Sequence, residues 1–393
     1  MALKLRTMDD VPLSGKRVLV RVDFNVTANE RGVVGRNEDY RLESAMQTIQ
    51  ELREMRCRVL LLTHRGRPGE GDGDIDLAPV RSRLERLLGE PVRALPRLYG
   101  PEVETIVGSM EQGTVAMYPN VRLDDREEQI SQKFGKDMGE HVDAFVSEAF
   151  SVCHRAHTSI SVLPQILPSA AGRRTVKEVE VLTALREHPE RPYVAITSGA
   201  KITTKIGMLR QLLRVVDTLC VGGQIANVFL AARKQWGNSM FSADELSAAQ
   251  SILAEAGDRL LLPVDVMVGD ALGTPESVKV VDVEDINEDV LGIWDIGPRS
   301  VQQIIDACAG AKTVMWNGPV GKFEVPAYAE ATYTLAERLS HLDSYRVIGG
   351  GDTVNALEKL NLVGSYDHVS VGGGAMIAFL EGKRMPGLEP LYR

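Results

Sequence analysis

The chain has 393 residues, a formal net charge of −9, 44% hydrophobic and 25% charged residues, and four cysteines without a CxxC pair. This length exceeds one ordinary core and predicts two or three domains of a globular protein. The acidic balance argues against a nucleic-acid partner, and no apolar run has the roughly 20 residues of a membrane-spanning helix. We expect a cytoplasmic protein without disulfides or a zinc site, because the cysteines are scattered and the first residues lack a signal-like apolar stretch.

Strands alternate with amphipathic helices through the first half of the chain. Nearly continuous apolar runs predict strands covered on both faces, as in a parallel sheet, and apolar residues at helical spacing predict helices. In chain order these elements are strand 17–24, helix 43–55, strand 58–64, helix 77–88, and strands 115–120 and 143–150.

The second half repeats this pattern after one charged amphipathic helix, 175–188, which is followed by Pro189 and Pro192. Its predicted strands are 193–199, 218–223, 259–268, 313–319, 345–351 and 368–374. The alternation predicts an α/β fold of two Rossmann-like lobes, each a mostly parallel sheet flanked by helices, joined by a bridging helix and hinge. The expected domains are 1–174, the bridging helix 175–188, 189–380, and a C-terminal tail, 381–393, that returns to the first lobe.

Glycine-rich turns follow five of the predicted strands in the second half. Glycine lets backbone N–H groups approach a ligand, and a helix N-terminus adds positive potential. One such turn is usually only a tight turn, but five at the carboxyl edge of one sheet predict a phosphate-binding site. GxxxxGK[ST] and GxGxxG are both absent, which excludes a P-loop and disfavours a dinucleotide site. The five segments are TSGAK (197–201), VGGQ (221–224), WNGPVG (316–321), IGGGDT (348–353) and VGGGA (371–375).

Basic side chains lie at the strand ends of the first half, and one more, Arg41, lies in a loop before a helix. A single arginine is usually a solvated surface group, but repeated placement after strands in an acidic chain predicts one positive patch for a small polyanion. The residues are Arg21, Arg41, His64, Arg67, Arg122, His154, Arg155 and His157.

Several of these segments resemble the signature motifs of the phosphoglycerate kinase family, in order and spacing, from about residue 8 to residue 387. The resemblance implies reversible, Mg²⁺-dependent phosphoryl transfer between 1,3-bisphosphoglycerate and ADP, giving 3-phosphoglycerate and ATP, as in glycolysis or gluconeogenesis. The motifs are RVDFN (21–25), THRGRP (63–68), NVR (120–122), CHRAHTS (153–159), SGAKITTK (198–205), WNGPVGKFE (316–324) and GGGDT (349–353).

The resemblance also implies roles for individual residues. It implies that the first lobe is the 3-phosphoglycerate-binding lobe. The residues implied to bind this substrate are Asp23, Asn25, Arg41, His64, Arg67, Arg122 and Arg155. The resemblance assigns the nucleotide to Lys201, Lys205, Gly222, Gly223, Asn317, Glu324, Gly350, Gly351, Asp352 and Thr353, with Asp352 linked to Mg²⁺. Catalytic roles are implied for Arg41, Lys201, Gly351 and Gly374.

The chain departs from the family pattern at several positions, none of which removes a charged residue with an implied role. The replacements are Arg65 for leucine, Pro119 for an acid, Glu148 for aspartate, Ser151, Val152 and Cys153 for Gly-Thr-Ala, Lys322 for valine, Val371 for threonine, and Met376 for a small or aromatic residue.

Two other functions remain as alternatives. A catalytically weak homologue that acts as a nucleotide-binding or regulatory protein should have lost Arg41, Lys201 or Asp352, and all three are present. A nicotinamide dehydrogenase is disfavoured by the absent fingerprint. We expect a monomer whose partners are small-molecule substrates, without nucleic acid or membrane, and the sequence leaves the nucleotide preference open.

Overall fold

The computed structural model describes residues 4–29, 32–35, 38–68, 75–199, 201–234, 241–286 and 292–393. The chain divides into two compact units: unit 1 is Met1–Glu180 with Lys383–Arg393, and unit 2 is Val181–Gly382. The division falls inside helix α7 (Arg173–Glu187), which therefore carries the chain from unit 1 into unit 2. The chain re-enters unit 1 at Lys383.

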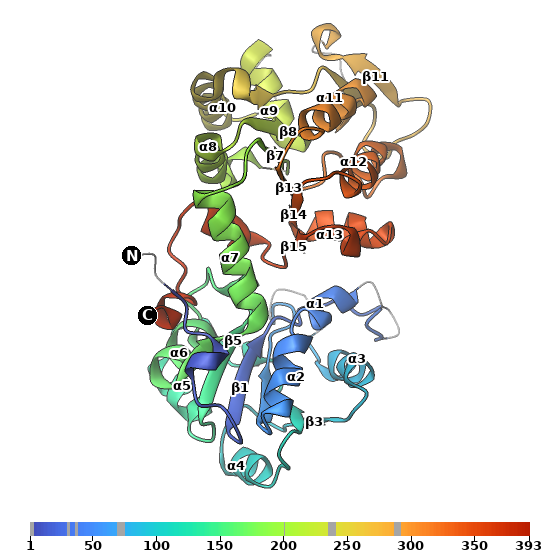
Figure 1. Cartoon of the computed structure of the whole chain (residues 1–393). Helices are drawn as coiled ribbons and strands as arrows, with labels where there is room; N and C mark the ends of the chain where they lie inside the picture. Colours follow the sequence, from blue (N-terminus) through green and yellow to red (C-terminus); the bar gives the residue numbers. More distant parts are fainter. Residues whose placement is uncertain are drawn as a thin grey trace. The chain divides into compact units, whose positions relative to one another are not determined.

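Unit 1 is built on a six-stranded parallel sheet with the order β3-β4-β2-β1-β5-β6. Helices lie on both sides of this sheet, with α2 and α3 on one side and α5 and α6 on the other (Figure 1). The strands are β1 (Arg17–Val22), β2 (Arg58–Leu62), β3 (Val92–Ala94), β4 (Val115–Met117), β5 (Ala144–Glu148) and β6 (Ser169–Ala171). The helices are α1 (Asp39–Glu43), α2 (Met46–Glu54), α3 (Ala78–Leu88), α4 (Pro101–Gly108), α5 (Gln132–Gly139) and α6 (Leu163–Ile166).

Alternate side chains of each strand enter two different cores in unit 1. On β1, Val18 and Val20 belong to the core that contains Ile49 of α2. Leu19 lies between them in sequence and belongs to the core that contains Phe134 of α5. Because both faces of the sheet are buried, each strand is a continuous apolar run in the sequence.

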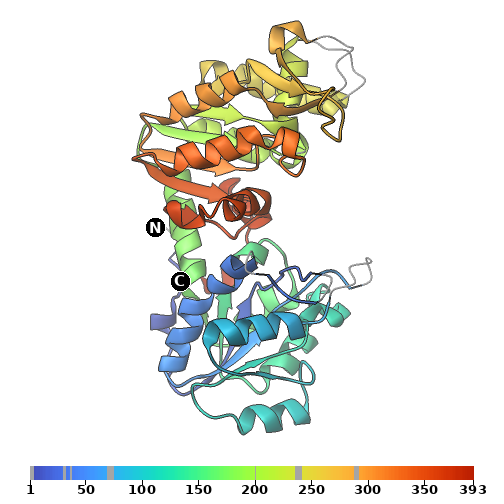
Figure 2. The ribbon, with the colours of Figure 1, turned by 90° about the vertical axis from the view of Figure 1, so that its right-hand side faces the viewer.

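Unit 2 has a second six-stranded parallel sheet, with the order β15-β14-β13-β7-β8-β9, and a three-stranded antiparallel sheet, β11-β10-β12. In Figure 2 the orange helices α11 and α12 lie in front of the larger sheet. The strands are β7 (Tyr193–Thr197), β8 (Thr218–Val221), β9 (Leu260–Leu261), β10 (Asp265–Val268), β11 (Lys279–Asp282), β12 (Ile293–Ile296), β13 (Thr313–Asn317), β14 (Tyr345–Gly349) and β15 (His368–Val369). The helices are α8 (Ile206–Val215), α9 (Gly223–Lys234), α10 (Ala243–Ala256), α11 (Pro298–Cys308), α12 (Glu330–Ser340), α13 (Gly351–Lys359) and α14 (Gly374–Leu380).

The α/β fold with two mostly parallel sheets is confirmed, but one predicted strand is wrong. The apolar run 259–268 forms two strands, because Pro263, which has no N–H for a ladder, lies between β9 and β10. The first belongs to the parallel sheet and the second to the antiparallel sheet. The sequence prediction also missed the short strands β3, β6, β11 and β12.

Two further features of the described residues concern the environment of the chain. Every helix in this part is too short or too polar to cross a lipid bilayer. The four cysteines, Cys57, Cys153, Cys220 and Cys308, are buried thiols without disulfide bonds.

Candidate active site

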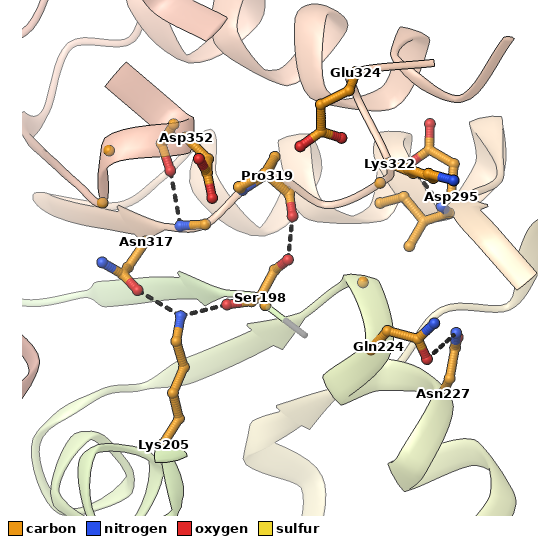
Figure 3. A pocket seen from close by; sticks show the side chains of 18 of the residues that line it. Ser198, Lys205, Gln224, Asn227, Asp295, Asn317, Pro319, Lys322, Glu324 and Asp352 are labelled. Atoms are coloured by element: carbon orange, nitrogen blue, oxygen red, sulfur yellow. Dashed lines mark hydrogen bonds between the residues drawn. The ribbon is translucent and has the colours of Figure 1, made fainter. Parts of the chain in front are cut away.

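A cavity of about 450 Å³ lies in unit 2, where the glycine turns after β7, β13 and β14 meet (Figure 3). Its walls come from the carboxyl ends of these strands, from the first residues of α9, α13 and α14, and from β12. Ligands of open α/β sheets bind at this edge. Of the residues predicted for the nucleotide or for catalysis, Lys205, Gly223, Asn317, Glu324, Gly350, Gly351, Asp352, Thr353 and Gly374 line the cavity.

Lys205 places a buried ammonium group in the wall of this cavity. Its Nζ donates to Asn317 Oδ1 at 2.6 Å and to the carbonyl oxygen of Ser198 (Figure 3). Burial lowers the pKa of Lys205 to about 8, and the negative charge of Asp352 partly opposes this shift. The cavity therefore holds a cation whose partners here are neutral oxygen atoms, so an anion would improve its solvation.

The turn between β14 and α13 depends on glycine for its shape. Gly350 has a φ of 95°, a conformation that L-residues with a side chain rarely adopt. It directly precedes Gly351, the first residue of α13, so the free N–H groups of that helix begin at the cavity wall. The turn is tied to the neighbouring strand because Thr353 Oγ1 accepts from the Gly318 N–H at 2.8 Å.

The cavity has a further wall that the sequence prediction missed together with β12. Trp294 is fixed by its indole N–H, which donates to the Gly269 carbonyl at 2.9 Å. The Lys322 ammonium lies 4.6 Å from the centre of the indole ring and donates to the Ala271 carbonyl at 2.8 Å. Both side chains line the cavity, so the unusual lysine contributes to its surface.

The structure does not bring two predicted nucleotide residues to the cavity surface. Gly222 is not one of the lining residues, and a Cβ at this position would come within 2.8 Å of Val320. Lys201 is exposed and lies outside the lining residues. The sequence motifs gave no indication that these two residues would lie outside the cavity lining. The main lining residues that the prediction did not include are Gln224, Asn227, Ile293, Trp294, Asp295, Ile296 and Ile377.

The donor set of the cavity suits a magnesium ion that arrives with a polyphosphate. Among the described residues, no three His, Cys, Asp or Glu side chains form a group that could hold a metal alone. Mg²⁺ is usually bound by one or two carboxylates together with water and substrate phosphates. The exposed carboxylate of Asp352, at the start of α13, fits this pattern.

A second cavity, of about 530 Å³, lies in unit 1 and is mainly polar. Its cationic wall consists of Arg67, Arg122 and Arg155, all predicted to bind 3-phosphoglycerate. The rest of the lining is Pro68, Asp124, Asp125, Glu128 and Gln129.

Arg122 is the most deeply buried arginine of this wall, with 8% of its surface exposed. One guanidinium nitrogen, Nη1, donates to the Gly66 carbonyl at 2.8 Å. Its Nε is buried without a hydrogen-bond partner among the described residues, and Glu128 Oε1 lies 3.5 Å away. Leaving a buried donor unpaired is costly, so a phosphate oxygen is a favourable partner.

The remaining predicted substrate residues gather around Asp23. The Asp23 carboxylate lies 3.2 Å from Arg41 Nη1 and accepts from Ser151 Oγ at 2.5 Å. His64 Nδ1 is 3.7 Å from it. Asn25 Oδ1 accepts from the Gly66 N–H at 2.9 Å, on the same residue whose carbonyl binds Arg122. The seven predicted substrate residues thus belong to one region of unit 1, and Ser151, noted only as a departure, joins them.

The histidines of this region are neutral at physiological pH. Burial, followed by the charges of neighbouring arginines, lowers the pKa of His157 to about 4. Burial likewise lowers the pKa of His64 far below its ordinary value; the negative charge of Asp23 opposes this shift, and the positive charge of Arg21 adds to it. Arg21 itself is 1% exposed and donates to Ser159 Oγ at 2.8 Å, so it lies beneath the expected surface patch.

The comparisons with known proteins agree over nearly the whole chain. A sequence profile of the family described as phosphoglycerate kinase matches residues 8–383. The chain is 40% identical over 391 residues to a phosphoglycerate kinase of Pelotomaculum thermopropionicum, covering 98% of each chain. It is 41% identical over 397 residues to that of Synechococcus sp. strain JA-3-3Ab, covering 96% of each.

Solved structures show the same likeness. The structure of phosphoglycerate kinase from Coxiella burnetii matches with a TM-score of 0.84 and 36% identity, covering 99% of both chains. That from Pyrococcus horikoshii matches with a TM-score of 0.87 and 25% identity, covering 98% of both. The resemblance noted in the sequence is confirmed, and the chain belongs to the phosphoglycerate kinase family.

Proposed function

We propose that unit 2 binds the magnesium complex of ADP or ATP and that unit 1 binds 3-phosphoglycerate or 1,3-bisphosphoglycerate. As a member of its family, the chain is a phosphotransferase with a carboxyl group as acceptor. The observation that carries the division of ligands is Lys205, a buried cation in the wall of a glycine-rich cavity at the carboxyl edge of a parallel sheet. Such an arrangement is suited to a nucleotide polyphosphate.

Within unit 2, the phosphates lie near Lys205 and the N-terminus of α13, and Asp352 contributes a carboxylate oxygen to Mg²⁺. When bound, Mg²⁺ neutralises phosphate charge and orients the oxygen atoms. Asn317 and Glu324 line the same cavity and are available to the nucleotide. Lys201 is exposed, and its long flexible stem lets the ammonium turn toward the phosphates when the nucleotide binds.

Within unit 1, the remote phosphate of the substrate occupies the cavity of Arg67, Arg122 and Arg155. A phosphate oxygen gives the unpaired Arg122 Nε its missing partner. The hydroxyl and carboxyl end of the substrate lies toward Asp23, Asn25 and Arg41. Asp23 supplies a hydrogen-bond acceptor for the hydroxyl group, and Arg41 supplies a cation for the carboxylate.

The chemistry requires charge stabilisation and no general base. The attacking carboxylate has an ordinary pKa near 4 and is already ionised at neutral pH, and the nearby histidines are neutral. The difficulty is the approach of two polyanions, which preorganised cations and backbone N–H groups relieve. Arg41, Lys201 and the first residues of α13 and α14, Gly351 and Gly374, are our candidates for the groups that contact the transferring phosphoryl group.

The cellular setting follows from the same features. Both proposed sites belong to one chain, so a monomer suffices for the reaction. The four buried thiols suit a reducing compartment, and the substrates are small water-soluble anions, so we place the enzyme in the cytoplasm.

A coupled assay tests the proposed function. ADP formation should require ATP, 3-phosphoglycerate and Mg²⁺ together, stop on addition of a chelator, and resume when Mg²⁺ is restored. Turnover in excess chelator would contradict the role of Asp352, and ATP consumption that ignores 3-phosphoglycerate would contradict the assignment of unit 1.

A further inference from the structure

Arg65 is an unusual buried cation beside the proposed phosphoglycerate site. It follows β2 between the predicted substrate residues His64 and Arg67, where the family pattern has leucine. Only 1% of its surface is exposed. Its guanidinium donates to the Val26 carbonyl at 2.9 Å and to the Asp76 carbonyl at 2.6 Å.

The main chain of Arg65 is held as firmly as its side chain. Asn120 Nδ2 donates to the Arg65 carbonyl at 2.6 Å and to the Ile75 carbonyl at 3.2 Å. Asn120 Oδ1 accepts from the Arg65 N–H at 3.3 Å and from the Arg122 N–H at 3.1 Å. Through this pair of residues, the chain segments that follow β1, β2 and β4 are joined to the segment before α3.

The planar guanidinium fork explains how one side chain can join these segments. Its donors diverge in fixed directions, so it can bind carbonyl groups of two separate segments at once. A leucine would fill similar space but leave both carbonyls without this donor. The Val26 bond is buried, so the loss of its donor costs free energy.

We propose that Arg65 is a positioning residue for the phosphoglycerate site, an inference that rests on the proposed function of unit 1. Arg65 is absent from the residues that line the arginine cavity, so it acts through its neighbours. Val26 directly follows Asn25, and Arg67 lies two residues after Arg65. Holding Val26 and Asp76 against the β2 turn therefore fixes the backbone that carries two substrate-binding side chains.

Three variants separate positioning from general stability and from charge. Arg65→Met removes the fork and the charge, and Arg65→Lys keeps the charge but loses the fork. Arg58→Met is the matched control, because Arg58 also donates to a backbone carbonyl, that of Met110 at 2.7 Å, but at the first residue of β2, the other end of the strand.

We expect Arg65→Met to raise KM for 3-phosphoglycerate about fivefold or more, as for the loss of about one hydrogen bond, and to leave KM for ATP unchanged. Arg65→Lys should keep at least half of this rise, and Arg58→Met should change neither constant more than about twofold. A KM for 3-phosphoglycerate in Arg65→Met equal to that of Arg58→Met would overturn the proposal. Full recovery in Arg65→Lys would also overturn it, because charge alone would then explain the effect.

Hydrogen exchange gives a measurement that needs neither substrate nor activity. Amides in peptides covering 75–88 should exchange faster in Arg65→Met than in Arg58→Met. The reason is that the Asp76 carbonyl loses the hydrogen bond from the Arg65 guanidinium, so this segment is held less firmly. Equal exchange would overturn the proposal even if the wild-type enzyme failed the coupled assay. If Arg65→Met does not fold, Arg65→Lys decides by the same two measurements.

Discussion

Lys205 shows how one buried side chain can make ligand binding depend on pH. Its pKa of about 8 in the ligand-free protein arises from burial, against the attraction of Asp352. Bound phosphates should raise this pKa, because they favour the ammonium form. Below about pH 8 both states carry the proton and the affinity for Mg·ADP should be constant. Above it only the complex keeps the proton, so the affinity should fall by up to about tenfold per pH unit until the pKa of the complex is reached.

Calorimetry of Mg·ADP binding between pH 6.5 and 9.5 checks this prediction. Lys205→Met should bind about 10- to 100-fold more weakly and lose the fall above pH 8, since a charged hydrogen bond is removed. Lys359→Met is the control, because Lys359 is an exposed lysine at the end of α13 that contacts the Phe323 ring. An unchanged pH profile in Lys205→Met would remove Lys205 as its source.

Residue types in motifs could be predicted from sequence more readily than their exposure. The motifs located charged residues at strand ends, and six of those with an implied role line the two cavities: Arg67, Arg122, Arg155, Lys205, Glu324 and Asp352. The sequence did not distinguish Arg21, which is buried under the site, from Arg67, which lines it. It also gave no sign that Ser151 would reach Asp23, a contact between segments 128 residues apart. Burial and long-range contacts depend on tertiary packing rather than on local pattern.

At the scale of elements, two adjacent glycines at the start of α13 have different roles. Gly350 allows the backbone conformation of the turn, and Gly351 keeps the cavity wall free of a side chain. Gly350→Ala should lower stability by about 1–3 kcal/mol, because alanine is strained at a φ of 95°. A Cβ at Gly351 meets no atom within 4 Å, so Gly351→Ala should unfold at the wild-type temperature or slightly above it. Its methyl group would nevertheless stand at the cavity wall and weaken Mg·ADP binding.

Thermal unfolding and calorimetry on both variants, with Gly364→Ala as a control at an open position, check this contrast. Equal destabilisation by both substitutions, or normal ADP affinity in Gly351→Ala, would contradict the separate roles.

Long elements with a clear period were predictable, and short ones were not. Strands β1, β2, β7 and β13 are buried on both faces and therefore have long apolar runs. Strand β11 has four residues, mostly exposed, and carries too little apolar signal. The missed β12 mattered most, because it brings Trp294 and Asp295 to the cavity.

At the scale of the whole molecule, the proposed ligands belong to different units of one chain. In-line transfer requires the acceptor carboxylate and the terminal phosphate to touch, so we expect the two ligands together to draw the units closer. Small-angle scattering should give a smaller radius of gyration with Mg·ADP and 3-phosphoglycerate, a combination that cannot react, than with either ligand alone. An unchanged radius in all three samples would contradict ligand-induced closure.

The most direct test of the account is a crossed kinetic measurement on Arg122→Met and Lys205→Met. The central claim is that unit 1 holds the phosphoglycerate and unit 2 holds the nucleotide. Initial rates over a grid of both substrates should show KM for 3-phosphoglycerate raised at least tenfold in Arg122→Met, with KM for ATP within about twofold of wild type. Lys205→Met should show the reverse. The assignment of the two sites would be contradicted if Arg122→Met raised mainly KM for ATP and Lys205→Met mainly KM for 3-phosphoglycerate. It would also be contradicted if each variant raised both constants equally.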